Sequence, residues 1–267
     1  MPAASLTVEH TQMADLTRRA REDRDVAVGV APLSVRDPAP GAELGRPMLG
    51  CPVDRVPGIV GDLVSTGADS LRLVCQLTTG ATPEELVRLE RACDDAKRLR
   101  GLDVVLWVDG EDPAAEVFSV GAALLLARTR PWVRVFLDPI DAYDRSMEVT
   151  SGLLDRRGNP TVMFGGVRAL ASIFATLDER LEPFSPAGGD ASSLLVRGLD
   201  AGEHGCRIVR LPEGRELGRL RPADVDLGGD HWPQDTRATG ADGSLVVRPD
   251  PRAALEAGEE TFVAIWW

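Results

Sequence analysis

Short apolar runs alternate with longer amphipathic runs over much of the chain, and this alternation most limits which folds the chain can adopt. The apolar runs cover residues 25–32, 68–77, 102–108 and 133–137. The amphipathic runs cover residues 56–66, 82–100, 113–130 and 162–177. Strands that recur every 30 to 45 residues or so, with helices between them, are typical of βα units in a parallel sheet. The pattern predicts four βα units, which form either half of a (β/α)₈ barrel or a small open doubly wound sheet.

Local signals indicate where some of these elements begin. Thr82 is followed by a proline and, three residues later, by Glu85. This combination is a capping box with proline at the first helical position, and it predicts a helix start at residue 82. Residues 4–21 have the spacing of an amphipathic helix. The proline- and glycine-rich segment 38–52 predicts a loop.

The segment 151–160 predicts a tight turn between two regular elements. It reads Ser-Gly-Leu-Leu-Asp-Arg-Arg-Gly-Asn-Pro, and its second half consists mainly of turn-forming residues. The helical run 162–177 follows almost at once. The turn therefore closes one βα unit and opens the last helix of the series.

The pattern changes after residue 186. Short apolar runs are separated by turns that contain Gly, Pro and Asp, and they cover residues 192–199, 206–211, 216–220, 244–247 and 261–267. This spacing predicts a small antiparallel β-domain, a β-sandwich. We therefore expect a partial barrel over residues 1–180 and a β-sandwich over residues 181–267.

Charge and motif content argue against several functional classes. The formal net charge is −12, which disfavours nucleic acid and anionic membranes as partners. The four cysteines form no CxxC or Cys/His spacing, so we expect buried free thiols and no metal site. No glycine-rich nucleotide loop follows a predicted strand, and we expect no cofactor. The first residues contain no secretion signal and no apolar run is long enough to span a bilayer, which predicts a cytoplasmic protein.

Several segments, taken in order, resemble the C-terminal half of the barrel in retaining glycosidases of the β-xylosidase and cellulase-like superfamily (glycoside hydrolase clan A). Residues 25–30, 67–74, 102–110 and 132–138 resemble the fifth to eighth barrel strands. The Gly-Leu-Leu-Asp and Gly-Asn-Pro phrases within 152–160 resemble the end of the barrel, and residues 262–266 resemble the end of the family's β-domain. The resemblance implies an incomplete (β/α)₈ barrel with a C-terminal β-sandwich.

Two carboxylates decide whether such a protein is a hydrolase. Retaining glycosidases place an acid/base and a nucleophile about 5 Å apart. In this family an Asn-Glu pair supplies the acid/base, and the sequence contains no Asn-Glu dipeptide. The resemblance places the nucleophile, normally a glutamate, after the seventh strand, where Asp109 and Glu111 are the candidates. The alternative interpretation of this acidic run is a solvated loop that begins the next helix.

Further candidates follow from the rule that catalytic groups of barrel enzymes lie at the C-terminal ends of strands. Asp138 and Asp141 are candidate catalytic carboxylates there, although Asp-Pro-Ile-Asp is also typical of a turn. Gln76, Trp107 and Tyr143 are candidates for substrate binding. Aromatic residues make up only 4% of the chain, which argues against a sugar cleft lined with many aromatic faces.

The residues together predict a degenerate glycosidase-like protein, non-catalytic alone, that acts as a carbohydrate-related or assembly subunit. Half a barrel leaves a strand edge and an apolar interior uncovered. We therefore expect a homo-oligomer or a partner chain that completes the barrel, with a carbohydrate as the candidate ligand.

Two alternatives to this prediction stay open. One is an active glycoside hydrolase, with a partner chain supplying the acid/base or with two of the candidate carboxylates acting together. The other is a protein-binding scaffold unrelated to sugars.

Overall fold

The structure of this protein is a computed structural model. It describes residues 27–31, 46–65, 67, 72–108, 112–138, 144–145, 148–149, 152–155, 157–177, 182–184, 195–201, 204–210, 218–225, 227, 231–243, 255–258 and 262–267.

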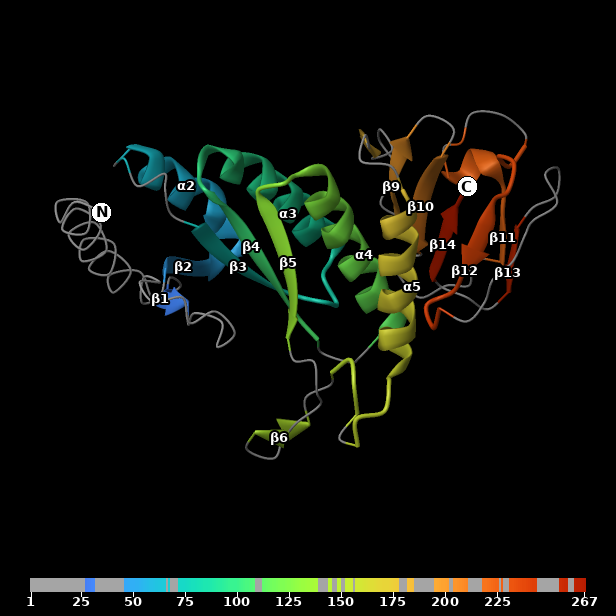
Figure 1. Cartoon of the computed structure of the whole chain (residues 1–267), viewed down its shortest axis with the longest axis horizontal. Coiled ribbons are helices and arrows are strands. Elements are labelled where there is room, and N and C mark those ends of the chain that lie inside the picture. The colour runs from blue at the N-terminus through green and yellow to red at the C-terminus, as the bar shows by residue number, and fades with distance from the viewer. Residues whose placement is uncertain are drawn as a thin grey trace, which may run out of the picture. The chain divides into compact units, whose positions relative to one another are not determined.

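Five of the described strands form one sheet, in the order β1-β2-β3-β4-β5 (Figure 1). They are Ala27–Ala31 (β1), Arg46–Pro52 (β2), Arg72–Thr78 (β3), Gly101–Trp107 (β4) and Val133–Asp138 (β5). β2 to β5 form a four-stranded parallel sheet, whereas β1 runs antiparallel to β2. The chain is therefore a mixed α/β protein, as the sequence predicts.

The first parallel strand is not the one that the sequence predicts. Residues 25–32 are expected to form a parallel strand, but β1 pairs antiparallel with β2. Residues 38–52 are expected to form a loop, but β2 occupies the end of that segment and pairs in parallel with β3. Pro47 and Pro52 favour a loop in the sequence. Both lie within one residue of a strand end, where a missing N–H disturbs the ladder least.

The four α-helices in the described residues match four predicted helical runs. They are Val56–Ser65 (α2), Pro83–Asp95 (α3), Pro113–Thr129 (α4) and Val162–Thr176 (α5). α3 begins with the predicted capping box: Thr82 N–H donates to Glu85 Oε2 (2.8 Å), and Glu85 N–H donates to Thr82 Oγ1 (3.3 Å). The predicted helix 4–21 lies outside the described residues. No helix in the described part of the chain has the length and hydropathy of a membrane span.

Short 3₁₀ turns border two of these helices. Val53–Arg55 precedes α2, and Ala96–Arg98 follows α3. The 3₁₀ turn after α3 explains why the predicted helix at 82–100 is longer than α3 itself.

A small two-stranded antiparallel sheet, Asp144–Arg145 (β6) with Glu148–Val149 (β7), follows β5.

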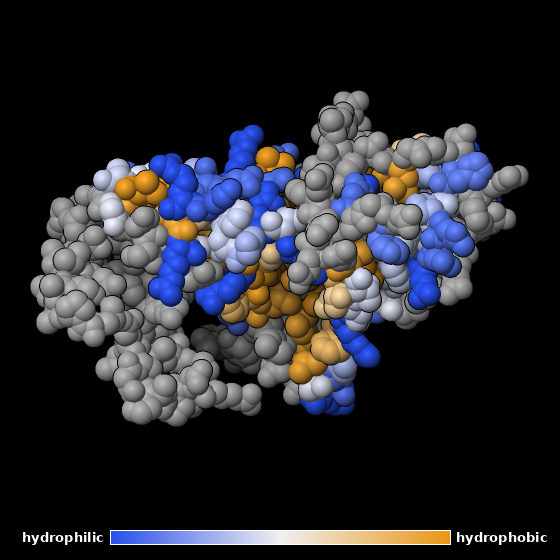
Figure 2. Space-filling view, turned by 45° about the horizontal axis from the view of Figure 1, so that its top comes forward, coloured by the Kyte–Doolittle hydropathy of each residue, from blue (hydrophilic) through white to orange (hydrophobic). Residues whose placement is uncertain are grey.

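The side chains of β5 alternate between a buried face and an open face. Val133 is buried and Val135 and Leu137 are partly buried, whereas Arg134, Phe136 and Asp138 are exposed. Phe136 keeps 45% of its surface exposed, and apolar residues reach the described surface beside charged ones (Figure 2). This alternation is unusual for a parallel strand, because parallel sheets normally have both faces covered.

An ion pair orders the open face between β4 and β5. Arg134 donates from Nε and Nη2 to Oδ1 and Oδ2 of Asp103, at 2.8 and 2.6 Å. The Asp103 side chain is 6% exposed, whereas that of Arg134 is 55% exposed. The hydrogen bond to Asp103 raises the pKa of Arg134. The bidentate pair therefore stays charged and holds the guanidinium of Arg134 against the sheet.

A separate antiparallel sheet forms from C-terminal strands in the order β12-β14-β10-β9-β8 (Figure 1). They are Arg237–Thr239 (β12), Phe262–Trp266 (β14), His204–Arg210 (β10), Leu195–Ala201 (β9) and Glu182–Phe184 (β8). Gly218–Leu220 (β11) pairs with Leu255–Gly258 (β13) in a second, two-stranded sheet. The sequence predicts β9, β10, β11 and β14, but not β8, β12 or β13. The predicted strand at 244–247 lies outside the described residues, and the β-sandwich stays a prediction.

Both faces of this antiparallel sheet carry packed residues. One face joins a buried cluster that includes residues of β11 and β13, namely Val196, Val209, Leu220, Val225, Trp232, Ala238, Leu255, Val263 and Ile265. α4 packs on the other face, where a Cβ added to Gly121 would lie 3.0 Å from Cδ1 of Ile208. α5 lies beside α4 (Figure 1). α4 is buried around most of its circumference, which explains why its apolar residues are not confined to one stripe.

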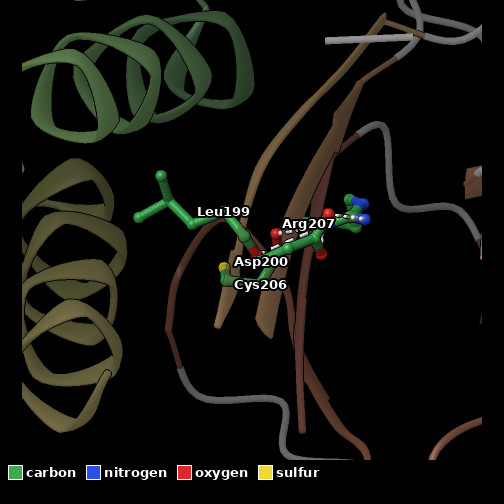
Figure 3. Close-up of polar contacts among 4 residues, drawn as sticks. All are labelled: Leu199, Asp200, Cys206 and Arg207. Atoms are coloured by element: carbon green, nitrogen blue, oxygen red, sulfur yellow. Dashed lines mark hydrogen bonds and ion pairs between the residues drawn. The ribbon is translucent and has the colours of Figure 1, made fainter. Parts of the chain in front are cut away.

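Arg207 is a buried cation of this sheet with a structural role. It lies on β10 and is 2% exposed. Its Nη1 donates to the carbonyl oxygens of Leu199 (3.2 Å) and Cys206 (3.1 Å) (Figure 3). Its guanidinium also forms a 2.8 Å ion pair with Asp200 and lies 5.3 Å from the ring of Trp267. These contacts offset the cost of burying the charge and tie β10 to β9.

Residue contacts divide the chain into two compact units. The first consists of Met1–Leu77, Val87–Val105 and Trp132–Phe136, and the second of Thr78–Leu86, Leu106–Pro131 and Leu137–Trp267. The second unit thus contains the C-terminal ends of β3, β4 and β5, together with α4, α5 and the antiparallel sheet. The two predicted domains, 1–180 and 181–267, stay a prediction.

We expect Gly166 of α5 to tolerate no side chain. A Cβ there would lie 2.1 Å from the carbonyl oxygen of Ala241 and 2.7 Å from Cγ2 of Val117 on α4. Gly166→Ala should lower the free energy of unfolding by about 1–3 kcal/mol, as overpacking does. Gly61→Ala on α2 is the matched control, since nothing lies within 4 Å of it, and it should raise stability by up to about 1 kcal/mol. Urea unfolding measures both, and equal effects would contradict the packing described.

Candidate functional site

Backbone hydrogen bonds join the C-terminal ends of β3, β4 and β5 in the second unit. Thr79 N–H donates to the carbonyl oxygen of Trp107 (2.8 Å), and Thr79 Oγ1 donates to the same oxygen (3.2 Å). Val108 N–H donates to the carbonyl oxygen of Asp138 (2.9 Å). The three strand ends therefore form a fixed row, at the sheet edge where functional groups of parallel α/β proteins lie.

This row brings together two of the predicted site residues, Trp107 and Asp138. Trp107 ends β4 and is 40% exposed, and Asp138 ends β5 and is also exposed. Because Val108 bonds to Asp138, the parallel ladder makes Trp107 and Asp138 neighbours on one face. The same register places Asp103 beside Arg134, the pair already found in contact. An indole face beside a carboxylate can pack on the C–H side of a sugar and accept a hydrogen bond from a hydroxyl.

The other predicted site residues are not part of this row. Asp109, Glu111, Asp141 and Tyr143 lie outside the described residues, so their roles stay predictions. Gln76 is exposed on β3 and belongs to the first unit. Asp138 is thus the one predicted carboxylate that the described residues include. Within that same part of the chain, no group of three or more His, Cys, Asp and Glu side chains could hold a metal ion.

The acidic run after β4 begins the next helix at Asp112, as the alternative interpretation of the sequence expects. Oδ1 of Asp112 accepts the N–H groups of Ala114 (3.0 Å) and Ala115 (3.1 Å), which makes Asp112 the N-cap of α4. Its Oδ2 lies 3.1 Å from Nη2 of Arg210 on β10. Both carboxylate oxygens are engaged, so Asp112 has a structural role rather than that of a free base.

Arg210 is a partner of Asp112 that the sequence does not predict. It ends β10, is 9% exposed and lies 98 residues from Asp112 in the sequence. An aspartate before a proline at a helix start identifies Asp112 as a cap. No local pattern identifies a cation on a distant strand. The pair ties the N-terminus of α4 to the antiparallel sheet.

The turn predicted at 151–160 is held together by Asp155. Its Oδ1 accepts the N–H groups of Arg157 and Asn159 (2.8 Å each), and its Oδ2 accepts the side-chain amide of Asn159 (2.9 Å). Gly158 has a φ of 79°, which favours glycine. The hydrogen bonds, first of all the one from the Asn159 side chain, lower the pKa of Asp155. Asp155 is therefore a structural residue that directs the chain into α5.

The four cysteines are buried free thiols, as the sequence predicts. Burial raises the pKa of Cys51 and of Cys206 to about 12. Burial also raises the pKa of Cys75, and the neighbouring thiols of Cys93 and Cys51 raise it further. At neutral pH the side chains of Cys51, Cys75 and Cys206 are therefore thiols rather than thiolates, which makes them poor nucleophiles.

No protein-family model matches the sequence, and no curated protein matches it either. Similar solved structures include the glycoside hydrolase family 30 subfamily 8 xylanase Xyn30A from Clostridium acetobutylicum (10% identity, 80% of this chain and 58% of that chain, TM-score 0.36). They also include the α-amylase from Geobacillus thermoleovorans (12% identity, 81% and 57%, TM-score 0.41) and a conserved exported protein from Bacteroides fragilis (12% identity, 72% and 45%, TM-score 0.41). This chain thus spans 58% of the length of the xylanase. TM-scores below 0.5 do not establish a shared fold.

Removing the cap of α4 should destabilise the protein in two separable ways. Asp112→Ala should lower the free energy of unfolding by about 2 kcal/mol or more, because a lost N-cap costs about 1 kcal/mol and the buried Arg210 loses a charged partner. Asp112→Asn keeps an oxygen for the cap and loses only the charge, so it should cost less. Guanidinium unfolding of both variants measures the difference. An asparagine variant as unstable as the alanine variant would show that the cap contributes nothing.

The stability contribution of Asp155 should depend on pH in a defined direction. Its pKa in the folded state lies below the ordinary value of 3.8. The contribution is therefore fully present above pH 3.8 and is lost as the pH falls through the folded-state pKa. Asp155→Asn should be less stable than the wild type at pH 7, and the difference should shrink steadily below pH 3.8. Urea unfolding between pH 7 and pH 2.5 tests this, and a difference that does not change with pH would contradict it.

Proposed function

We propose that this chain is a degenerate glycosidase-like protein, non-catalytic alone, that acts as an assembly subunit by completing its parallel sheet with another polypeptide. One observation carries the proposal: β5 is last in the order of described sheet strands and exposes Arg134, Phe136 and Asp138. Parallel sheets normally have both faces covered, and proteins protect their edge strands. An edge strand with a half-exposed phenylalanine therefore supports a partner at β5.

The described carboxylates favour binding over catalysis. Retaining hydrolysis needs two carboxylates about 5 Å apart, and inverting hydrolysis needs two at about 6.5–9.5 Å. Asp138 is the one predicted carboxylate found at the described strand ends. Asp112, the next described acidic residue after β4, caps α4 and pairs with Arg210. These observations support a subunit that does not hydrolyse glycosides by itself.

A carbohydrate is the ligand class that the strand ends support best. Trp107 offers an exposed indole face, and Asp138 beside it offers hydrogen-bond acceptors. This juxtaposition also favours the second candidate function, an active glycoside hydrolase in which Asp138 acts with Asp109 or Glu111. A scaffold role unrelated to sugars is the third candidate, and saccharide binding separates it from the first two.

Aryl glycoside hydrolysis by the purified chain separates these candidates. We expect no turnover above background, because the sequence lacks the Asn-Glu pair that supplies the acid/base in the glycosidases it resembles. Turnover that disappears in Asp138→Asn and persists in the control Glu84→Gln would establish the hydrolase instead.

Saccharide binding should weaken in Trp107→Ala if the strand ends hold a sugar. Calorimetric titration with xylo- and malto-oligosaccharides measures it, and no binding to the wild type would exclude a sugar ligand and favour a role unrelated to sugars.

A further inference from the structure

We propose that a second copy of this chain pairs with the edge of β5 that no described strand occupies, antiparallel to β5 about a twofold axis through Phe136. The inference rests on the proposed assembly role of this edge and names its partner. In this pairing, two five-stranded sheets join through their β5 strands into one continuous sheet.

The ladder between β4 and β5 shows which backbone groups point to the free edge. The carbonyl groups of Trp132 and Asp138 accept hydrogen bonds from the β4 side, at 2.9 Å each. In a parallel ladder, alternate residues of a strand bond to the same neighbour. The even-numbered residues of β5 therefore bond to β4. The N–H and C=O groups of Val133, Val135 and Leu137 point to the other edge, which no described strand occupies.

The exposed side chains of β5 are complementary to their own copy. A twofold axis at Phe136 places Arg134 opposite Asp138 of the second copy, and by symmetry Asp138 opposite its Arg134. Phe136 then lies opposite Phe136 of the second copy. Because even-numbered residues direct their backbone groups to β4, all three are non-hydrogen-bonded pairs, whose Cα atoms approach to about 4.5 Å. Opposite-charge pairs and aromatic pairs at such positions stabilise antiparallel sheets.

Other symmetric registers lack this match. An axis at Arg134 places two guanidinium groups opposite each other. An axis at Val135 places Arg134 opposite Phe136, and an axis at Leu137 places Asp138 opposite Phe136. The strand Val133–Asp138 is therefore self-complementary in one antiparallel register only. If a strand of another polypeptide paired in parallel with β5, the sequence of β5 would not by itself provide these matched charged and aromatic pairs.

Arg134 is already oriented for this contact. Asp103 fixes its guanidinium through Nε and Nη2, and the side chain remains 55% exposed. These two bonds use two of the five N–H donors of an arginine, so donors remain for a second carboxylate. The guanidinium also lies 5.5 Å from the ring of Phe136. Less conformational freedom is lost on pairing when the side chain is held in place beforehand.

Sedimentation velocity of the full chain tests the proposal. The wild type should sediment as a dimer of twice 28.6 kDa. Asp138→Arg places arginine opposite arginine twice and should weaken the dimer about tenfold or more. Val135→Pro removes an edge N–H without altering the exposed charges and should also weaken it. Glu84→Arg makes the same charge change at an exposed position of α3 and should leave the dimer intact.

A mixing experiment tests the register and guards against a folding defect. Arg134→Asp and Asp138→Arg should each be weak dimers alone, while their mixture pairs every arginine with an aspartate and should restore the dimer. Circular dichroism checks that each variant is folded. A monomeric wild type at 100 µM, or a dimer that neither Asp138→Arg nor Val135→Pro weakens, would overturn the proposal.

The outcomes separate this inference from the proposed function. A wild type that is monomeric and hydrolyses no glycoside overturns self-pairing alone, because another polypeptide could still occupy β5. A dimer weakened by Asp138→Arg supports self-pairing. If that dimer also hydrolyses aryl glycosides, the non-catalytic role fails while the pairing stands.

Discussion

No described strand pairs with the outer edge of β5, and this edge is the main constraint on how the protein can exist in water. A parallel strand is normally covered on both sides, yet β5 exposes Arg134, Phe136 and Asp138 along one strand. The Asp103–Arg134 pair holds part of this face in order, and Trp107 extends it at the strand ends. The same strand therefore links the sheet, the candidate ligand site and the proposed partner. A protein with this strand in water needs either an occupant or a means of preventing aggregation.

Much of the fold could be predicted because its signals are local. The capping box at Thr82 and Glu85 and the turn at Asp155 depend on residues within a few positions of each other, and both are found. Helices and buried strands follow from the spacing of apolar residues, and α2 to α5 were recognisable in that way. The strand-end rule places Asp138 at the C-terminal end of β5, where the ladder makes it a neighbour of Trp107, and the functional roles of both residues stay predictions.

The rest could not be predicted, because it depends on contacts distant in sequence. The direction of β1 is set by its pairing with β2, not by its own residues, and Pro47 and Pro52 made β2 resemble a loop. Arg210 reaches Asp112 across 98 residues. The short strands β8, β12 and β13 have too few residues for a periodic pattern, and they form because β9, β14 and β11 offer edges to pair with.

A disulfide between two copies of the chain at the twofold axis would show directly that they pair through β5. In the proposed dimer, Phe136 of each copy lies in a non-hydrogen-bonded pair with Cα atoms about 4.5 Å apart, within the range that a disulfide spans. Phe136→Cys, treated with oxidised glutathione, should form a covalent dimer as two thiols are oxidised and the glutathione disulfide is reduced. The native thiols are buried and serve as the internal control. We predict a dimer band on non-reducing gels for Phe136→Cys and none for the wild type. A Phe136→Cys chain that stays monomeric under oxidation would contradict pairing through β5.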